Sequence, residues 1–259
     1  MKGELQEESI SLVAVGKFET KGDRNALLLQ QILHERIQRE TFPGPEYIEW
    51  LERFQKKLKP RTYLEIGVES GYSLQFAKEP TRSIGIDPDP GIRFTIKSPM
   101  KLFALNSDDF FKEYNLTNEF DGLPVSLAFI DGLHEYDQAL RDFFNIERHS
   151  TKSTIVLLHD VQGAIPEIST RDRETNYWAG DTWKIMHVLK EYRPDLTIAT
   201  IPTYPTSLGV ITNLNPNYSY TKTDFNEMVK FAENLKFDEN VFVGKTKNDF
   251  AIVDRLLKI

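Results

Sequence analysis

The sequence contains no cysteine among its 259 residues, which excludes disulfide bonds and metal sites built on thiolates. It also lacks a long hydrophobic run, since no stretch approaches the roughly 20 apolar residues that a membrane-spanning helix needs. The first 23 residues carry early acidic side chains and only a short apolar patch, unlike the basic start and apolar run of a signal peptide. From these absences we expect a soluble, cytoplasmic protein with no membrane partner.

Positive charge is also in short supply. The chain has 32 Lys and Arg against 39 Asp and Glu, a net charge of −7, and the basic residues form no long block. Because nucleic-acid backbones are bound by concentrated positive charge, we expect no nucleic-acid partner. The hydrophobic content of 40% suffices for a substantial core, and the length allows either one large domain or one domain with an appendage. Both a monomer and a homo-oligomer remain open.

What the sequence does contain is an alternation of predicted helices and strands. Amphipathic helices are predicted at 25–38 and 46–58, on either side of the Pro43-Gly44-Pro45 break. Several later segments are near-continuous apolar runs, as expected for parallel strands covered on both faces. This alternation is typical of a doubly wound, Rossmann-like α/β sheet. The predicted strands are 63–68, 83–87, 101–105, 125–131, 153–160, 196–201 and 207–212.

We divide the chain into three parts: an N-terminal helical cap at 1–59, a sheet domain at 60–212 and a C-terminal α/β extension at 213–259. A long polar stretch, 161–180, precedes a predicted helix at 181–192. With the N-terminal helices, this stretch is expected to close over the strand ends as a lid. Its Tyr177 and Trp178 suit either stacking on a ligand ring or burial in the core.

The most informative segment is 61–74, RTYLEIGVESGYSL. A short apolar strand ends there, and Gly67 and Gly71 open a predicted helix whose free N–H groups suit a nucleotide-like ligand. A dinucleotide-binding turn needs a second glycine two residues after the first, and here that residue is Glu69. Its carboxylate would repel a pyrophosphate, so the turn favours a ligand with a cationic amino-acid portion, such as S-adenosylmethionine. A turn with incidental glycines is the alternative.

Polar residues follow the second and third predicted strands, at the edge where open α/β sheets bind ligands. Asp87 lies about 20 residues beyond the glycine turn, where a carboxylate can accept hydrogen bonds from both ribose hydroxyls. With Pro88 next in sequence, Asp87 is alternatively a helix N-cap. Ser107 and Asp108 are placed either to reach an adenine amino group or to cap the helix that follows.

The fourth and fifth predicted strands carry the candidate chemistry. Asp131 ends the fourth strand and opens DGLHEY, which contains His134, while His159 and Asp160 end the fifth. If these strands are neighbours, the two carboxylates lie close together, beside an imidazole that suits either a divalent ion or a general base. The candidate catalytic residues are therefore Asp131, His134 and Asp160. In the alternative interpretation, Asp131 caps a helix and His134 packs beneath it.

Together these segments resemble the class I S-adenosylmethionine-dependent methyltransferases over roughly residues 60–212. The resemblance is to the branch with an FIDGxHxY segment, an L-x-D helix and an LHD strand end. That branch is similar to cephalosporin-hydroxylase-like and macrolide-sugar O-methyltransferase proteins. Gly180-Asp181-Thr182-Trp183-Lys184 also resembles a G-D-x-W-K element of such proteins; the alternative is a helix N-cap by Asp181 with Trp183 in the core. The matching residues are Phe129–Asp131, Gly132, His134, Tyr136, Leu140, Asp142 and Leu158–Asp160.

The resemblance implies a seven-stranded, mostly parallel sheet whose order reverses beside the Glu65–Gly71 turn, with strand 207–212 antiparallel. It implies O-methylation of a small-molecule or sugar hydroxyl, with S-adenosylmethionine as cofactor and Asp87 at its ribose. Magnesium would lie on Asp131, His159 and Asp160, although relatives tend to carry an acid at position 159 and magnesium prefers oxygen ligands. Without a metal, His134 is the candidate base. The residues implied at the cofactor are Glu65, Gly67, Gly71, Asp87, Ser107, Asp108 and Asp131.

Two alternatives of other classes remain. A nicotinamide-dependent oxidoreductase shares the sheet class, but Glu69 and the carboxylate cluster are not features that hydride transfer requires. A non-catalytic protein that keeps the fold for ligand sensing would bind the cofactor without turnover. The sequence does not identify the methyl acceptor.

Overall fold

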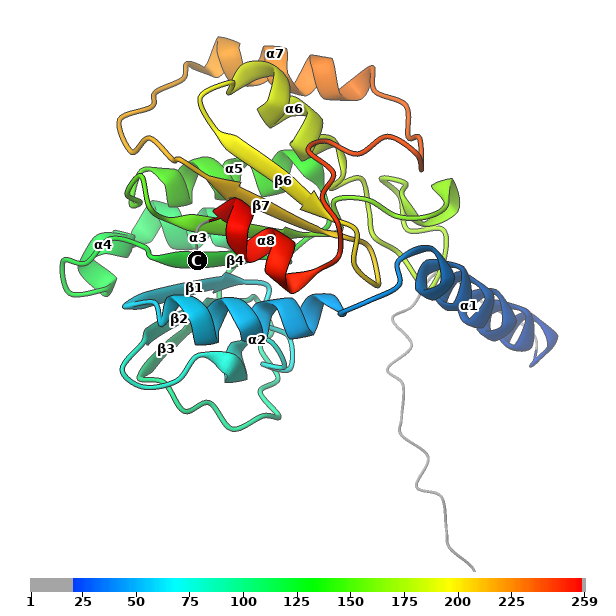
Figure 1. Ribbon diagram of the computed structural model, residues 1–259, viewed down its shortest axis with the longest axis horizontal. Coiled ribbons are helices and arrows are strands. Elements are labelled where there is room, and N and C mark those ends of the chain that lie inside the picture. Colours follow the sequence, from blue (N-terminus) through cyan, green and yellow to red (C-terminus); the bar gives the residue numbers. More distant parts are fainter. Residues whose placement is uncertain (1–20, 258–259) are drawn as a thin grey trace, which may run out of the picture.

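The computed structural model describes residues 21–257 and has one seven-stranded sheet at its centre (Figure 1). Along the sheet the strands follow the order β3-β2-β1-β4-β5-β7-β6. The first five strands pair in parallel, and β7 runs antiparallel to both of its neighbours. The predicted strand number, the order reversal beside β1 and the antiparallel last strand are all confirmed. The strands are β1 Thr62–Ile66, β2 Arg82–Ile86, β3 Met100–Phe103, β4 Leu127–Ile130, β5 Ile155–His159, β6 Thr197–Ile201 and β7 Leu208–Thr212.

Helices cover both faces of the sheet, so the strands are buried on both sides. On β4, Leu127 and Phe129 belong to the core beneath α2 and α8, while Ala128 and Ile130 belong to the core beneath α3, α5, α6 and α7 (Figure 1). This alternation follows from the two-residue repeat of a strand. The helices are α1 Lys21–Thr41, α2 Tyr47–Leu58, α3 Ser107–Glu113, α4 Leu116–Glu119, α5 Tyr136–Glu147, α6 Lys184–Tyr192, α7 Lys222–Glu233 and α8 Phe250–Leu257, with short 3₁₀ turns η1 Leu74–Phe76 and η2 Pro166–Ile168.

The predicted helix after the glycine turn is wrong. Only the single 3₁₀ turn η1 follows β1, and no helix separates β2 from β3. On this face α2 occupies the position such a helix would take: Trp50 and Phe54 pack in one cluster with Leu74 and Ala77. Between β2 and β3 the prolines at 88, 90 and 99 lack the N–H groups that a helix requires.

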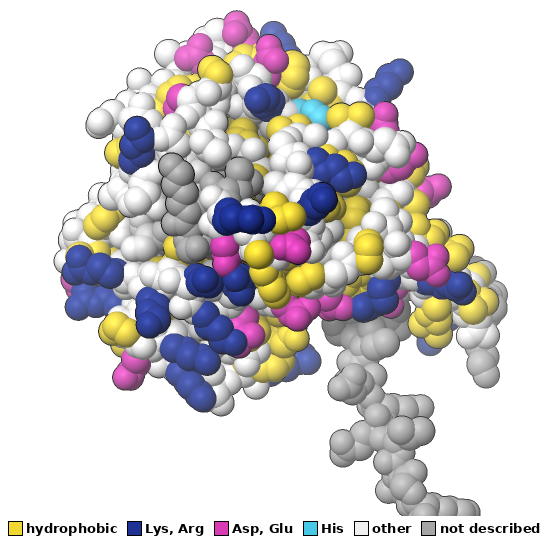
Figure 2. Space-filling view, in the orientation of Figure 1, with side chains coloured by type: hydrophobic (Ala, Val, Ile, Leu, Met, Phe, Trp, Pro, Cys, Tyr) yellow, Lys and Arg dark blue, Asp and Glu magenta, His cyan; other side chains and the backbone are white. Residues whose placement is uncertain are grey.

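The segments on either side of the sheet domain contribute further helices. The C-terminal segment forms the helices α7 and α8, as expected. In place of the expected strand, its described residues form only an isolated bridge between Lys245 and Thr200. At the other end α1 projects from the body and exposes hydrophobic side chains (Figures 1 and 2), among them Leu28, Leu29, Ile32 and Leu33. None of the helices in residues 21–257 combines the length and the apolar character needed to cross a membrane.

Candidate active site

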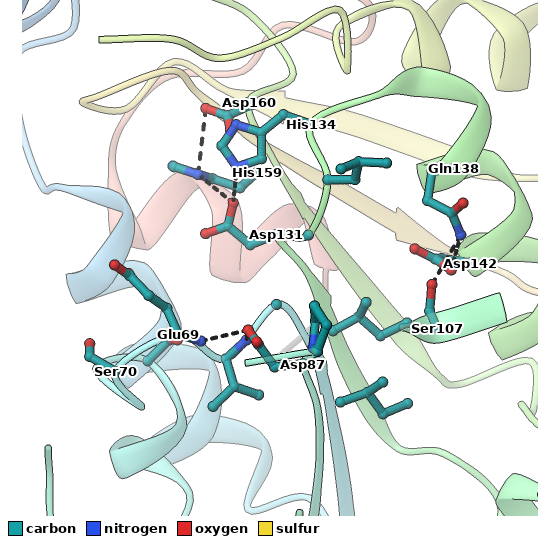
Figure 3. Close-up of a pocket in the computed structure, with 18 of the residues that line it drawn as sticks. Glu69, Ser70, Asp87, Ser107, Asp131, His134, Gln138, Asp142, His159 and Asp160 are labelled. Carbon is teal, nitrogen blue, oxygen red and sulfur yellow. Dashed lines mark hydrogen bonds and ion pairs between the residues drawn. The ribbon is translucent and has the colours of Figure 1, made fainter. Parts of the chain in front are cut away.

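A cavity of about 1420 Å³ opens at the carboxyl ends of the parallel strands. Three groups of residues border it (Figure 3): the turn after β1 with Asp87, a polar group around Ser107, and a cluster of two carboxylates and two imidazoles. The predicted residues Glu65 and Gly71 do not line the cavity. The predicted residues that do line it are Gly67, Asp87, Ser107, Asp108, Asp131, His134, His159 and Asp160.

Asp87 holds the turn after β1. Its Oδ2 accepts hydrogen bonds from the backbone N–H groups of Val68 and Glu69, both at 2.8 Å, and its Oδ1 accepts one from Asp89 N at 2.8 Å. Because no helix follows Pro88, the N-cap alternative for Asp87 is wrong. Gly67 has a φ of +86°, and a Cβ built on it would lie 2.0 Å from the carbonyl oxygen of Asp131. A glycine is therefore required where β1 and β4 end side by side.

Glu65 lies beneath this turn and is fully buried. The Tyr63 hydroxyl donates to Glu65 Oε2 at 2.6 Å, and the Ser73 hydroxyl donates to Oε1 at 2.5 Å. Burial raises the pKa of Glu65 to about 8, although both hydrogen bonds act in the opposite direction. The residue thus ties β1 to the segment before η1 rather than presenting its carboxylate to the cavity.

The second group joins α3 to α5 (Figure 3). Gln138 Nε2 donates to Ser107 Oγ at 3.0 Å, to Asp108 Oδ1 at 3.2 Å and to Asp142 Oδ1 at 3.1 Å. Burial raises the pKa of Asp142 to about 7. The N-cap of α3 is Asn106, whose side chain accepts from Asp109 N, so capping by Ser107 or Asp108 is wrong. Gln138 was not predicted from the sequence, and Asp142 was named only as part of the L-x-D helix. Their four-residue spacing on one helix was the signal that could have paired them.

The third group brings together the ends of β4 and β5. His134 Nδ1 lies 3.0 Å from Asp160 Oδ2, and His134 Nε2 lies 3.5 Å from Asp131 Oδ1. His159 Nδ1 lies 3.1 Å from Asp131 Oδ1 and 3.5 Å from Asp160 Oδ1. The Thr206 hydroxyl donates to Asp160 Oδ1. Each carboxylate therefore contacts both imidazoles, because β4 and β5 are neighbours in register.

Opposite charges control ionisation in this cluster. Burial alone would raise the pKa of Asp131, but the charge of His159 and hydrogen bonds from both histidines outweigh burial and hold that pKa well below its usual range. Burial lowers the pKa of His134, but Asp160 and Asp131 outweigh it and raise the pKa to about 9. The pKa of His159 is raised for the same reason. At neutral pH His134 is thus an imidazolium beside the carboxylate of Asp131.

The cluster also contains a candidate set of metal ligands. Ligand atoms of Asp131, His134 and Asp160 lie within 4.8 Å of one another, the single such group among residues 21–257. The predicted set had His159 in place of His134. The buried His134 Nδ1, His159 Nε2 and Asp160 Oδ2 make no hydrogen bond within the described chain, although the first and the last lie 3.0 Å apart as an ion pair. These atoms remain as possible ligands for a cation. Two imidazoles beside two carboxylates nevertheless fit magnesium poorly, because magnesium prefers oxygen ligands.

Aromatic rings flank both histidines. Trp178 stacks on His134 with ring centroids 5.5 Å apart, and Tyr47 stacks on His159 at 4.2 Å. Tyr177 also lines the cavity. Trp178 and Tyr177 come from the predicted lid segment, whereas Tyr47, at the start of α2, was not predicted. Tyr47 lies just after the Pro-Gly-Pro break, and nothing in the sequence around it indicates a role at the site. Only the fold places it beside β5.

The match to known families covers the same elements. Residues 64–161 match a family model described as a methyltransferase domain. The segment runs from β1 to just beyond β5, so it contains the glycine turn, Asp87 and the carboxylate–imidazole cluster, but less than half of the chain. The match is to a methyltransferase domain, and the seven-stranded sheet has the strand order of the class I methyltransferase fold. No curated protein matches the chain.

Solved structures of similar fold include three methyltransferases. An O-methyltransferase from Streptomyces achromogenes in complex with SAM is 14% identical, with 76% of this chain and 100% of that chain covered and a TM-score of 0.48. An O-methyltransferase from Bacillus cereus in complex with SAH is 13% identical, with 74% and 91% covered and a TM-score of 0.47. A methyltransferase from Podospora anserina bound to SAH is 17% identical, with 79% and 100% covered and a TM-score of 0.45.

Proposed function

We propose that this methyltransferase transfers the methyl group of S-adenosylmethionine to a hydroxyl oxygen of a small molecule, a sugar or natural product being the expected class. The observation that carries the proposal is the continuity of one cavity from the Gly67 turn and Asp87 to the cluster of Asp131, His134 and Asp160. A cofactor held at the turn would thus present its reactive end to the groups able to remove a proton.

The residues present fit S-adenosylmethionine. The cavity exceeds the roughly 300–1,000 Å³ of ordinary ligand pockets, so it has room for both a cofactor and an acceptor. The Asp87 carboxylate is fixed by three backbone N–H groups and keeps lone pairs for the ribose hydroxyls. Ser107 and Asp108 are proposed at the adenine, and Gly67 at the methionine portion. Glu69, in the turn, carries a charge that suits the cationic end.

When bound, S-adenosylmethionine supplies an electrophilic methyl group on a sulfonium. We assign His134 as the base, with Nε2 accepting the proton of the acceptor hydroxyl. Nε2 has the longer carboxylate contact, 3.5 Å, whereas Nδ1 lies 3.0 Å from Asp160 Oδ2, an ion-pair distance. Asp131 and Asp160 orient the ring and stabilise the imidazolium that forms. The mechanism takes no step through magnesium, because the donor set fits that ion poorly.

Cofactor binding is tested by calorimetry with S-adenosylhomocysteine and with NAD. Binding of the first and not of the second is expected. Binding of NAD alone would instead support the oxidoreductase, and absence of both ligands at millimolar concentration would overturn the proposal. Turnover is then measured with a panel containing a hexose, a catechol and a simple aliphatic alcohol. Cofactor binding without methylation of any acceptor, including extracts of the host cell, would favour the non-catalytic alternative.

The base is tested by pH and by chelation. His134 must lose its proton before it can act, and its pKa is raised to about 9. We therefore expect kcat to rise with pH towards 9 and to be unaffected by EDTA. Asp131→Asn and Asp160→Asn should each lower kcat strongly while cofactor affinity stays nearly constant. Loss of activity in EDTA, with recovery on adding one divalent metal, would replace the histidine mechanism by a metal-assisted one.

A further inference from the structure

The segment Gly180–Asp181 lies against the backbone that carries His134. Asp181 N donates a hydrogen bond to the carbonyl oxygen of His134 at 3.1 Å, and Tyr136 N donates to Asp181 Oδ1 at 3.1 Å. One residue from a distant part of the chain therefore binds the carbonyl of residue 134 and the amide of residue 136. The backbone on both sides of Glu135 is therefore held by hydrogen bonds to Asp181.

The alternative interpretation of Asp181, as the N-cap of the helix that follows it, is wrong. Helix α6 begins at Lys184 and has no side-chain cap, whereas Asp181 Oδ1 accepts the first N–H of α5. The N-cap residue of α5, Glu135, makes no side-chain cap hydrogen bond of its own. A buried carboxylate at a helix N-terminus both satisfies a free N–H and interacts favourably with the helix dipole. Trp183 is buried, as the same alternative expected.

The approach of this segment is too close for any side chain at position 180. A Cβ built on Gly180 would lie 1.8 Å from the His134 carbonyl oxygen, and Gly180 has a φ of +67°. His134 itself has a φ of +61°, a left-handed conformation that a histidine retains only where its surroundings enforce it. The contacts with Gly180 and Asp181 supply that enforcement.

Charged groups hold Asp181 in turn. Its Oδ2 lies 3.1 Å from Lys184 Nζ, and its Oδ1 lies 3.5 Å from Arg171 Nη1. Arg171 also pairs with Glu135 and Asp137 at the start of α5. From the same loop, Trp178 stacks on the His134 ring. The loop thus contacts both the backbone and the side chain of His134.

We propose that Asp181 is a positioning residue that holds His134 in its left-handed backbone conformation, so that the imidazole lies between Asp131 and Asp160. Gly180 permits the approach. The effect of this role on kcat rests on the proposed function. The position of the His134 ring does not, since it can be measured without turnover.

The test compares Asp181→Ala with Asp181→Asn. The alanine variant loses the acceptor for Tyr136 N, and the asparagine variant retains an oxygen there. We expect Asp181→Ala to lower kcat about 10- to 100-fold, the scale of a catalytic group displaced by about 1 Å, with the affinity for S-adenosylhomocysteine unchanged. Asp181→Asn should recover most of the loss. A fall in KM alone or in cofactor affinity alone would overturn the proposal.

Two controls separate positioning from simple loss of stability. Thr221 caps α7 by accepting from Asp224 N, so Thr221→Ala removes a cap hydrogen bond away from the cavity and should leave kcat unchanged. In a His134→Ala background, Asp181→Ala should change kcat less than about twofold, because a residue that acts through His134 has nothing left to position. Additive losses would contradict the role.

Crystal structures of the Asp181→Ala and Thr221→Ala variants complete the test. In Asp181→Ala we expect residues 134–136 to shift and the His134 ring to leave at least one of its two carboxylate partners. A ring that keeps both contacts overturns the positioning role even if no acceptor is ever turned over. Failure of the wild-type protein to bind S-adenosylhomocysteine would overturn the proposed function separately.

Discussion

Three residues at the cavity have left-handed backbone conformations, which are unfavourable for residues with a side chain. Glu69, His134 and Asp160 all line the cavity, and all have positive φ angles, of 47°, 61° and 57°. A left-handed non-glycine residue costs on the order of 1–3 kcal/mol, so it persists only where other contacts fix it. Asp87 fixes the N–H of Glu69, Asp181 fixes the carbonyl of His134, and Thr206 holds the carboxylate of Asp160.

Asp87 is expected to matter for the cofactor through its carboxylate. Asp87→Ala should weaken S-adenosylhomocysteine binding by roughly 1.5–3 kcal/mol, about 10- to 150-fold in Kd, because a charge-assisted hydrogen bond to the ribose is lost. Calorimetry measures the change. Asp89→Ala is the matched control: Asp89 lies in the same loop, is exposed and does not line the cavity. Equal affinities for the Asp87 variant and the control would remove Asp87 from the cofactor site.

Glu65 should make stability depend on pH. Its folded-state pKa of about 8 lies above its ordinary value, so between the two values the folded protein holds a proton that the unfolded chain releases. The free energy of unfolding therefore falls as pH rises through this window. Glu65→Gln removes the titration, and the wild type should lose roughly 2–4 kcal/mol relative to it between pH 5 and pH 8. In denaturant titrations of both proteins, the difference between their free energies of unfolding should change by this amount across the pH range. Parallel curves would contradict the assignment.

Among the elements, the connections determine the site more than the strands do. After β1 and β2 the chain forms loops rather than helices, and the two loops bond to each other through Gly91 N to Glu69 O and Arg93 N to Ser70 O, both at 2.8 Å. They form one wall of the cavity. The loop before α6 also lines the cavity, through Asn176, Tyr177 and Trp178. Asp181, which precedes α6, caps α5. Neither connection has a periodic pattern from which it could be recognised.

The turn after β1 should be intolerant of any side chain. In Gly67→Ala the new Cβ would lie 2.0 Å from the Asp131 carbonyl oxygen, in a residue with positive φ. We expect a loss of roughly 2–5 kcal/mol of stability, together with weaker S-adenosylhomocysteine binding. Gly91→Ala is the control, since a Cβ there meets nothing within 4 Å. Thermal unfolding and calorimetry compare the two. A Gly67 variant as stable as the Gly91 variant would show that the strand ends can separate.

For the whole molecule, a buried ion pair joins elements away from the cavity. Arg193 follows α6 and contacts Glu147, at the end of α5, through Nη1–Oε2 at 2.6 Å and Nη2–Oε1 at 2.8 Å. Their side chains are 0% and 2% exposed. The segment after β7 joins through Asn215 N, which donates to Glu147 Oε1 at 3.0 Å. The pair thus connects three parts of the layer that covers one face of the sheet.

Removal of Arg193 should destabilise the protein without altering the site. Arg193→Ala leaves Glu147 buried without its cation, which costs about 3–5 kcal/mol and should lower Tm by roughly 6–20 °C. Arg82→Ala breaks an exposed pair with Asp121 and should cost less than about 1 kcal/mol. Calorimetric melting measures both, and S-adenosylhomocysteine affinity at low temperature should be the same in each. A small effect at Arg193 would show that the ion pair contributes little to stability.

The sequence predicted the strands and the coarse site because both depend on local patterns. Seven apolar runs with intervening polar segments indicated a doubly wound sheet, and polar residues directly after parallel strands were expected to gather at one edge. This placed Asp87, Asp131 and Asp160 correctly along the cavity without any knowledge of packing. The helices expected after β1 and before β3 failed, since α2, which no local pattern assigns to that face, covers it instead.

Composition and strand pattern therefore determined the class of sheet and the edge at which acidic residues gather, whereas the order reversal followed from the resemblance to class I methyltransferases. Tertiary structure alone decided that Glu65 is buried beneath the turn rather than in the cavity, that Tyr47 and Trp178 flank the two histidines, and that Asp181 caps α5 instead of its own helix. Strand periodicity repeats every two residues and can be read locally. A contact between residues 45 positions apart depends on how the loops close, and that is set by packing of the whole chain.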